Sequence, residues 1–282
     1  MIVDFHVHST ASDGTLAPEE IVASARSRGF FALAITDHDN VDAFACGNPG
    51  AIAGIELSVE PGEGFDKFHL LGIGIDPVNS GLAMFLKRVI DGRNARNRRM
   101  LENFSRIGIE IDPADISAYA HGDVLARPHF AQWLAKHGYA SDVKSAFDRY
   151  LLPDSPGETR CYEERWHPSQ EAAFEAIHRA GGLCVMAHPK HWRREWRFAG
   201  PDYGVAEREL MRLKEAGLDG LEALYQANSV EENVNFVRLA DRAGLLKTAG
   251  SDFHGANKPF ISLGMEVEES YISPFLAALN LV

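Results

Sequence analysis

The sequence contains no apolar run long enough to span a membrane, and its first residues form neither a basic nor a long apolar leader. Cysteine is scarce: Cys46, Cys161 and Cys184 lie far apart, which argues against a disulfide framework and against a cysteine-based zinc site. Basic residues are outnumbered, because 28 Lys and Arg oppose 40 Asp and Glu and give a net charge of −12 with His neutral. We therefore expect a cytoplasmic protein that binds neither duplex DNA nor a membrane, and no feature indicates an oligomeric state.

The 282 residues, 45% of them hydrophobic, suffice for one large core with an inserted subdomain. In residues 1–82 and 168–282, short β-rich runs alternate with amphipathic helical segments, a rhythm typical of an α/β fold with parallel strands and outer helices. Strands are expected at 2–7, 31–36, 51–57, 68–75, 183–187, 220–224 and 246–249, and helices at 18–28, 169–180, 206–216 and 230–243. Because few residues separate His38 from Glu56, we expect a compact crossover there without the usual helix.

Residues 83–167 interrupt this rhythm with successive helical patterns and few β-rich runs. We expect them to form a helical subdomain that is inserted into the α/β core and placed over it as a lid. No internal repeat and no long linker divides the chain further.

Histidines and acidic residues gather at the ends of the predicted strands. The set comprises His6, His8, Asp13, His38, Glu56, His69, His188, Asp252 and His254. The carboxyl ends of parallel strands meet at one edge of an α/β fold, so these side chains are expected to line one pocket, with His69 as an exception near the start of its strand. Imidazole and carboxylate ligands suit Zn²⁺, Mn²⁺ or Fe²⁺, and the number of ligands indicates two or three divalent ions that share a bridging carboxylate.

Six motifs in this set resemble those of the PHP (polymerase and histidinol phosphatase) superfamily of metal-dependent phosphoesterases. They are H-x-H at 6–8, D-G-T at 13–15, T-D-H-D at 36–39, G-I-E-L-S at 54–58, A-H-P at 187–189 and G-S-D-F-H-G at 250–255. The resemblance implies a distorted (β/α)7 barrel with a trinuclear metal centre. It also implies three ligand sets: His6, His8, Glu56 and Asp252; Asp13, His38 and His254; and Glu56, His69 and His188, with Glu56 as the bridge.

The inserted helices and the triplet Arg127-Pro128-His129 are similar to those of the small nucleotide phosphatases within this superfamily. This resemblance implies that a metal-activated hydroxide hydrolyses the phosphomonoester of a nucleoside monophosphate, a 3′,5′-bisphosphonucleotide or a short oligonucleotide end. Three divalent ions and three carboxylates would leave the centre positively charged, so a phosphate dianion would be attracted in spite of the negative total charge.

Arg127 is the leading candidate for phosphate binding, because its guanidinium can donate two parallel hydrogen bonds to an anion. Arg93 is a second candidate, since helical phasing places it in the middle of an apolar stripe, where a charge needs a phosphate or carboxylate partner. His129 is a candidate acid for the leaving group. Asp37 and Asp39 are expected to orient ligand imidazoles or to cap a helix.

The remaining aromatic and histidine residues give weaker indications. Trp192 and Trp196 follow His188 closely and are candidates for stacking on a nucleotide base. We interpret the other histidines, His121, His137, His167 and His178, as structural.

Three alternatives stay open beside the nucleotide phosphatase. A histidinol-phosphate-type phosphatase fits the insertion less well. An amidohydrolase-like C–N hydrolase also uses H-x-H and a late Asp, but it does not account for Asp13, Glu56 and the Asp252/His254 pair together. A non-catalytic barrel that binds metal and nucleotide would not need the intact ligand set.

Overall fold

A computed structural model describes residues 1–60, 62, 67–119, 125–192 and 202–282. Its centre is an eight-stranded sheet in the order β7-β6-β5-β4-β3-β2-β1-β8. The strands are β1 (Ile2–Asp4), β2 (Ala32–Ile35), β3 (Ile52–Val59), β4 (Phe68–Ile73), β5 (Leu183–Met186), β6 (Gly220–Tyr225), β7 (Leu246–Gly250) and β8 (Met265–Glu266). The sheet curls into a nearly closed barrel, because the chain after β1 pairs with the end of β7: Phe5 N donates to Ala249 O at 3.0 Å and His8 N to Phe253 O at 2.9 Å. The predicted distorted barrel is confirmed.

The expectation of parallel strands is wrong for β4, which pairs antiparallel with both β3 and β5. The reason is the short link of residues 60–67 between β3 and β4, which leaves no room for the crossover helix that a parallel pair needs. β8 is also antiparallel to β1. As a consequence, β4 starts at the edge where the parallel strands end, and Ser58 of β3 lies opposite His69.

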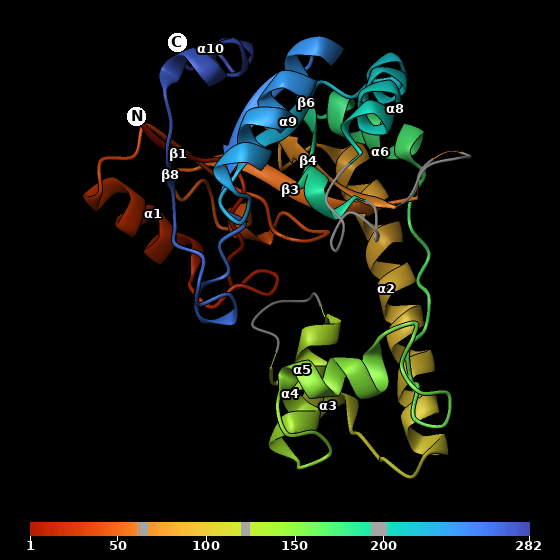
Figure 1. The fold of residues 1–282 in the computed structure, drawn as a ribbon. Coiled ribbons are helices and arrows are strands. Elements are labelled where there is room, and N and C mark those ends of the chain that lie inside the picture. The colour runs from red at the N-terminus through yellow and green to blue at the C-terminus, as the bar shows by residue number, and fades with distance from the viewer. Residues whose placement is uncertain (61, 63–66, 120–124, 193–201) are drawn as a thin grey trace.

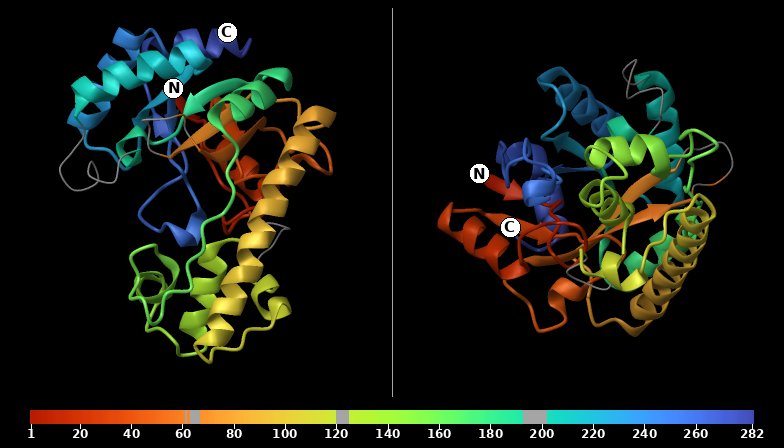
Figure 2. Two further views of the ribbon diagram at one scale, coloured as in Figure 1. Left: turned by 90° about the vertical axis from the view of Figure 1, so that its right-hand side faces the viewer. Right: turned by 90° about the horizontal axis from the view of Figure 1, so that it is seen from below.

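Helices cover the outside of the barrel (Figures 1 and 2). They are α1 (Pro18–Ser27), α6 (Gln170–Arg179), α8 (Tyr203–Ala216), α9 (Val230–Ala243) and α10 (Glu269–Ala278). Each buries an apolar face; on α9, for example, Phe236, Leu239 and Ala240 pack into the main core. Between β2 and β3 the chain forms only the short 3-10 helix η1 (Asp42–Phe44), which confirms the compact crossover.

The inserted segment has a hydrophobic core of its own. Helix α2 (Ser80–Arg106) starts against the barrel, where Leu82 and Leu86 join the main core, and runs away from it (Figure 1). At its far end, Phe104 packs with Phe130 and Tyr150. The other elements there are α3 (Pro113–Ser117), α4 (Arg127–Lys136), α5 (Val143–Ala146) and the π-helical turn η2 (Phe147–Leu151). Two connections therefore join the insert to the barrel, α2 and the returning segment 152–168.

Among the described helices, none combines the length and the apolar character that a membrane span requires.

Candidate metal centre

Backbone pairing beyond the strand ends brings the sequence-predicted residues together. The chain after β1 forms a parallel bridge with the chain after β7, between Val7 and Phe253, so that the H-x-H motif lies beside the G-S-D-F-H-G motif. The chain after β2 continues along β3 in the same way: Glu56 N donates to Asp37 O at 3.1 Å, and Asp39 N donates to Glu56 O at 3.0 Å. Local sheet structure thus places four of the motifs at one edge of the barrel.

The structure brings all nine candidate ligands into three groups, in each of which the ligand atoms lie within 4.8 Å of one another. The groups are His8, Asp13, His38 and His254; His6, His8, Glu56 and Asp252; and Glu56, His69 and His188. They match the ligand sets that the resemblance implies, except that His8 belongs to two groups. His69 joins them because β4 is antiparallel and starts at this edge.

Glu56 is the centre of this arrangement, because its two carboxylate oxygens lie close to five imidazoles. Its Oε2 lies 3.3 Å from His6 Nε2, 3.1 Å from His8 Nε2 and 3.2 Å from His38 Nδ1. Its Oε1 lies 2.7 Å from His69 Nδ1 and 3.1 Å from His188 Nε2. Burial alone would raise the pKa of Glu56, but the His38 and His6 imidazoles hold it well below its usual value. An ionised carboxylate between two groups has the geometry of a bridging ligand.

The donor set suits divalent cations. Burial lowers the pKa of His8 well below its usual value, and the nearby His254 and His38 lower it further, so the His8 imidazole is neutral and keeps one nitrogen lone pair for a cation. Burial would raise the pKa of Asp13, but His38 and His254 hold it well below its usual value. Neutral imidazoles beside ionised carboxylates are the ligand forms that Zn²⁺, Mn²⁺ and Fe²⁺ bind.

Glu222 on β6 is a functional residue that the sequence analysis missed. His6 Nδ1 donates to its Oε1 at 2.9 Å, which directs His6 Nε2 toward Glu56, and His188 N donates to its Oε2 at 2.5 Å. A Cβ at Gly250 would collide with Glu222 Oε1, so only glycine leaves room for this carboxylate. The available signal was a charged residue inside an apolar strand, and a buried carboxylate behind a ligand imidazole orients it.

The expectation that Asp37 and Asp39 orient imidazoles or cap a helix is wrong. Asp37 accepts hydrogen bonds from Ser9 N at 2.8 Å and from Ser12 Oγ at 2.6 Å, and so fixes the loop that leads to Asp13. Asp39 forms ion pairs with Arg93 and, at 2.7 Å, with Arg165 Nη1. The apolar stripe around Arg93 thus predicts its need for an anionic partner, whereas no pattern in the sequence predicts the contact of Arg165.

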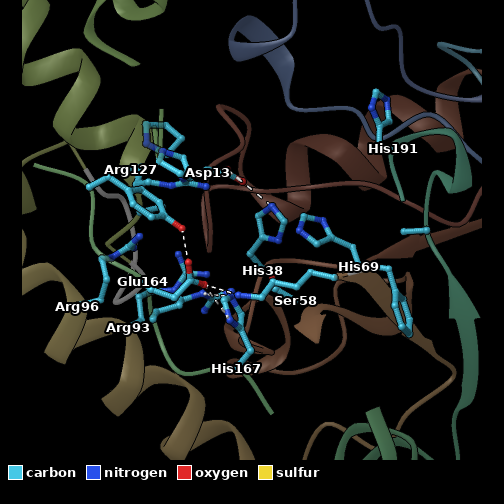
Figure 3. Close-up of a pocket in the computed structure, with 18 of the residues that line it drawn as sticks. Asp13, His38, Ser58, His69, Arg93, Arg96, Arg127, Glu164, His167 and His191 are labelled. Carbon is cyan, nitrogen blue, oxygen red and sulfur yellow. Dashed lines mark hydrogen bonds and ion pairs between the residues drawn. The ribbon is translucent and has the colours of Figure 1, made fainter. Parts of the chain in front are cut away.

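A cavity of about 550 Å³ opens between this edge of the barrel and the insert (Figure 3). Part of its lining, here called the ligand end, comes from Asp13, His38, His69 and His188. Another part, here called the arginine end, comes from Arg93, Arg96, Arg127 and Arg165. Figure 3 shows Arg93, Arg96 and Arg127 on one side and His38 and His69 on the other. The insert therefore supplies positive charge to the same cavity that the metal centre borders.

The arginines are more numerous than the carboxylates that pair with them. Within the described part of the chain, neither Arg96 nor Arg127 forms an ion pair with a carboxylate. Arg96 Nε donates to Asn97 Oδ1 at 2.8 Å, and Arg127 Nη1 donates to Leu151 O at 3.3 Å. Burial and the neighbouring Arg93 and Arg127 lower the pKa of Arg96 to about 8. Four guanidiniums line one cavity, and two of them form no ion pair in the described residues, which favours an anionic ligand.

Of the remaining candidates, Trp192 and His167 line the cavity, whereas His129 is not among its lining residues. His129 is buried in α4, accepts a hydrogen bond from Ala126 N at its Nδ1 and is not among the lining residues described for the cavity. Trp192 lines the cavity and packs edge-to-face on Phe68. Trp196 and His121 lie outside the described residues. His167, which we had interpreted as structural, also lines the cavity; burial and Arg165 lower its pKa to about 3.

A barrel with three histidine and carboxylate groups at one edge, beside a cationic cavity, defines a metal-dependent hydrolase of phosphate esters. The PHP domain family model matches residues 4–172, and the chain belongs to this family. It is 33% identical to a 3′,5′-nucleoside bisphosphate phosphatase of Chromobacterium violaceum, over 89% of this chain and 87% of the relative. It is 30% identical to the 5′-3′ exoribonuclease Rnm of Escherichia coli, over 95% of this chain and 89% of the relative.

Two solved structures share the fold over nearly the whole chain. One is described as an amidohydrolase from Chromobacterium violaceum with bound sulfate; it has a TM-score of 0.82 and 29% identity, and covers 99% of this chain and 96% of its own. The other, from Bifidobacterium adolescentis, carries the provisional designation of a metal-dependent phosphoesterase; it has a TM-score of 0.77 and 28% identity, and covers 98% of this chain and 96% of its own.

Proposed function

We propose that this chain hydrolyses the phosphomonoester of a nucleotide-like small molecule that carries a second anionic group. The scissile phosphate binds at the ligand end of the cavity, and the second anion binds at the arginine end. The observation that carries this proposal is the pair Arg96 and Arg127, which line the same cavity as His38 and His69. Arg96 is buried and Arg127 is half-buried, and neither has a carboxylate partner in the described residues. The name of the bisphosphate phosphatase relative supports the same substrate class.

We further propose that two or three divalent ions, Mn²⁺, Fe²⁺ or Zn²⁺, bind to the three groups, with Glu56 shared between them. Bound there, divalent ions would supply a hydroxide nucleophile at neutral pH and neutralise the charge of the phosphate. Two contacts hold the carboxylate of the candidate ligand Asp252 in place: Lys258 Nζ lies 2.5 Å and Tyr225 Oη 3.2 Å from its Oδ2. Burial would raise the pKa of Asp252, but His6 and Lys258 hold it well below its usual value, so it stays ionised.

The arginine end would bind and orient the substrate. A guanidinium donates paired hydrogen bonds to phosphate oxygens, and low exposure to water strengthens them. Holding the second anion there fixes the nucleotide with its other phosphate toward the ligand end, which is the orienting part of catalysis. The role of His129 as an acid for the leaving group stays a prediction. Its Nδ1 accepts a hydrogen bond from Ala126 N, so only its Nε2 could donate a proton.

The cavity argues against the C–N hydrolase alternative. An amide substrate is neutral at the reacting bond and gives no reason for four arginines in the lining, whereas a nucleotide with two phosphates does. The non-catalytic alternative predicts binding of metal and nucleotide without release of phosphate, so turnover distinguishes it from the proposed enzyme.

A substrate panel tests the proposal. The metal-loaded enzyme is incubated with adenosine 3′,5′-bisphosphate, adenosine 5′-monophosphate, histidinol phosphate, a short 5′-phosphorylated RNA and an N-acyl amide, with Mn²⁺ or with a chelator. We expect metal-dependent release of inorganic phosphate, with the highest kcat/KM for the bisphosphate. Turnover of the amide without phosphate release, or no turnover at all, would contradict the proposal. Glu56→Gln serves as the control for contaminating phosphatases.

A further inference from the structure

Asp39 occupies an unusual position between the metal centre and the insert. It directly follows the candidate ligand His38, is almost fully buried, and adopts a left-handed backbone conformation with φ of 59°. Its Oδ2 pairs with Arg93 Nη2 and, at 2.7 Å, with Arg165 Nη1. A single carboxylate oxygen on the barrel therefore holds two guanidiniums of the arginine end.

The two arginines come from different connections between the barrel and the insert. Arg93 lies on α2, and Arg165 lies on the returning segment 152–168. These connections run side by side, as Figures 1 and 2 show. Two hydrogen bonds join them: Arg99 Nη2 donates to Glu164 O at 2.9 Å, and Asn103 Nδ2 donates to Glu163 Oε1 at 2.8 Å. Asp39 thus contacts both connections from the barrel edge.

We propose that Asp39 is a positioning residue that sets the distance between the arginine end and the ligand end, and thereby gives the enzyme its preference for substrates with two anions. This inference rests on the proposed function. Asp39 acts through Arg93 and Arg165 and touches no substrate. Its neighbour His38 lines the ligand end, whereas Asp39 itself pairs with two arginines of the arginine end, so two consecutive residues connect the two ends.

The charge distribution requires such a residue. The four guanidiniums of the arginine end repel one another, and Arg93, Arg127 and Arg165 each lower the pKa of at least one neighbouring guanidinium. Without Asp39, Arg93 and Arg165 would have no carboxylate partner in the described residues and would separate. With Asp39, both are held while Arg96 and Arg127 stay available for an anion.

The contact is not optimised for stability alone. Asp39 Oδ1 and Arg93 Nε are buried, and neither has a hydrogen-bond partner in the described residues. The left-handed backbone of a non-glycine residue adds strain. Buried unsatisfied groups and backbone strain are unfavourable for folding and are typical of functional sites.

The test is the variant Asp39→Asn, because asparagine keeps the shape of the side chain and tolerates the left-handed conformation but lacks the charge. Loss of the charged pairs should raise KM for adenosine 3′,5′-bisphosphate roughly ten- to a hundredfold. KM for adenosine 5′-monophosphate, kcat and metal content should change little. The matched control is Asp37→Asn on the other side of His38; Asp37 fixes the loop to Asp13, so its loss should affect both substrates equally.

Two further variants keep the test decisive. Arg165→Gln removes a partner from the other connection and should reproduce the selective rise in KM, and the double variant with Asp39→Asn should be no worse than either single variant. An equal loss for both substrates, or tighter binding of the bisphosphate by Asp39→Asn, would overturn the positioning role. Calorimetric binding of adenosine 3′,5′-bisphosphate to the chelator-treated protein measures the same effect without turnover, so the inference can fail or succeed independently of the proposed function.

Discussion

His69 Nδ1 lies 2.7 Å from Glu56 Oε1, although His69 stands at the start of its strand and Glu56 in the second half of the neighbouring one. This contact exists because β3 and β4 are antiparallel, whereas β3 is parallel to β2 on its other side. The reversal of this strand brings His69 to Glu56 Oε1, which His188 also contacts, while His6, His8 and His38 lie at Oε2. It therefore makes Glu56 a residue that can be shared between metal sites.

Replacing Glu56 should damage more than one site. We expect Glu56→Gln to lose more than one equivalent of bound metal, because one oxygen of the amide is a weaker ligand and the other position is occupied by an NH₂ group that cannot bind a cation. Elemental analysis of the purified variant measures this. Asp13→Asn is the matched control, since Asp13 belongs to one group and should lose about one equivalent. A full metal complement in Glu56→Gln would refute the bridging role.

Glu222→Gln tests the carboxylate behind His6. The amide can still accept a hydrogen bond from His6 Nδ1, but it no longer makes the imidazole more basic, so metal affinity should fall about 10- to 100-fold. Competition with a chromogenic chelator measures this affinity. Glu232→Gln is a suitable control, because Glu232 pairs with Lys190 and belongs to none of the three groups. Equal affinities of Glu222→Gln and wild type would show that the hydrogen bond has no influence on the centre.

Arg127→Ala should affect substrate binding and leave the metal centre intact. Charge-assisted hydrogen bonds to one anion are worth about 1.5–3 kcal/mol, so kcat/KM should fall roughly ten- to a hundredfold. Arg127→Lys should recover only part of the loss, because an ammonium cannot make the planar two-point contact. Arg98→Ala on α2, an exposed residue outside the cavity lining, should behave as wild type. Loss of metal in Arg127→Ala would assign this residue a structural role instead.

His167 should make the protein sensitive to acid. Its pKa in the folded protein is lowered to about 3 by burial and by Arg165, whereas an unfolded histidine titrates near 6.5. The unfolded state therefore binds a proton first, and the stability that neutral His167 provides above pH 6.5 is lost as the pH falls below that value. The loss is at most about 1.4 kcal/mol per pH unit, and water at the cavity reduces it.

Urea unfolding of chelator-treated protein between pH 7 and pH 4 measures this effect without contributions from metal release. His167→Gln should flatten the dependence of the free energy of unfolding on pH relative to wild type. Parallel curves for the two proteins would show that the His167 pKa is not shifted.

Much of the candidate centre could be predicted because local patterns determine it. Residues i and i+2 of an extended chain project from one face, and this spacing brings His6 and His8 together although β1 itself ends at Asp4. Helical phasing placed Arg93 on the buried face of α2, where the structure has it. The antiparallel direction of β4 was not predicted, because the β-rich pattern of a strand does not reveal its direction.

The partners of these residues depend on contacts between distant parts of the chain. Arg165 lies in an irregular segment without periodicity, and only the path of the insert brings it to Asp39, 126 residues away in the sequence. Glu222 lies in a strand whose other residues are apolar, and only the closed barrel turns it toward His6, 216 residues away. Such pairs need the tertiary fold, which no spacing within the sequence encodes.

We propose that one cavity combines a phosphoesterase metal centre with a site for a second anion. The most direct test is the ratio of kcat/KM for adenosine 3′,5′-bisphosphate to that for adenosine 5′-monophosphate, measured by phosphate release with Mn²⁺ and with a chelator. One additional charge-assisted contact corresponds to a ratio of roughly ten or more, and the chelator should abolish both rates. A ratio near one, or rates that the chelator leaves unchanged, would contradict the claim.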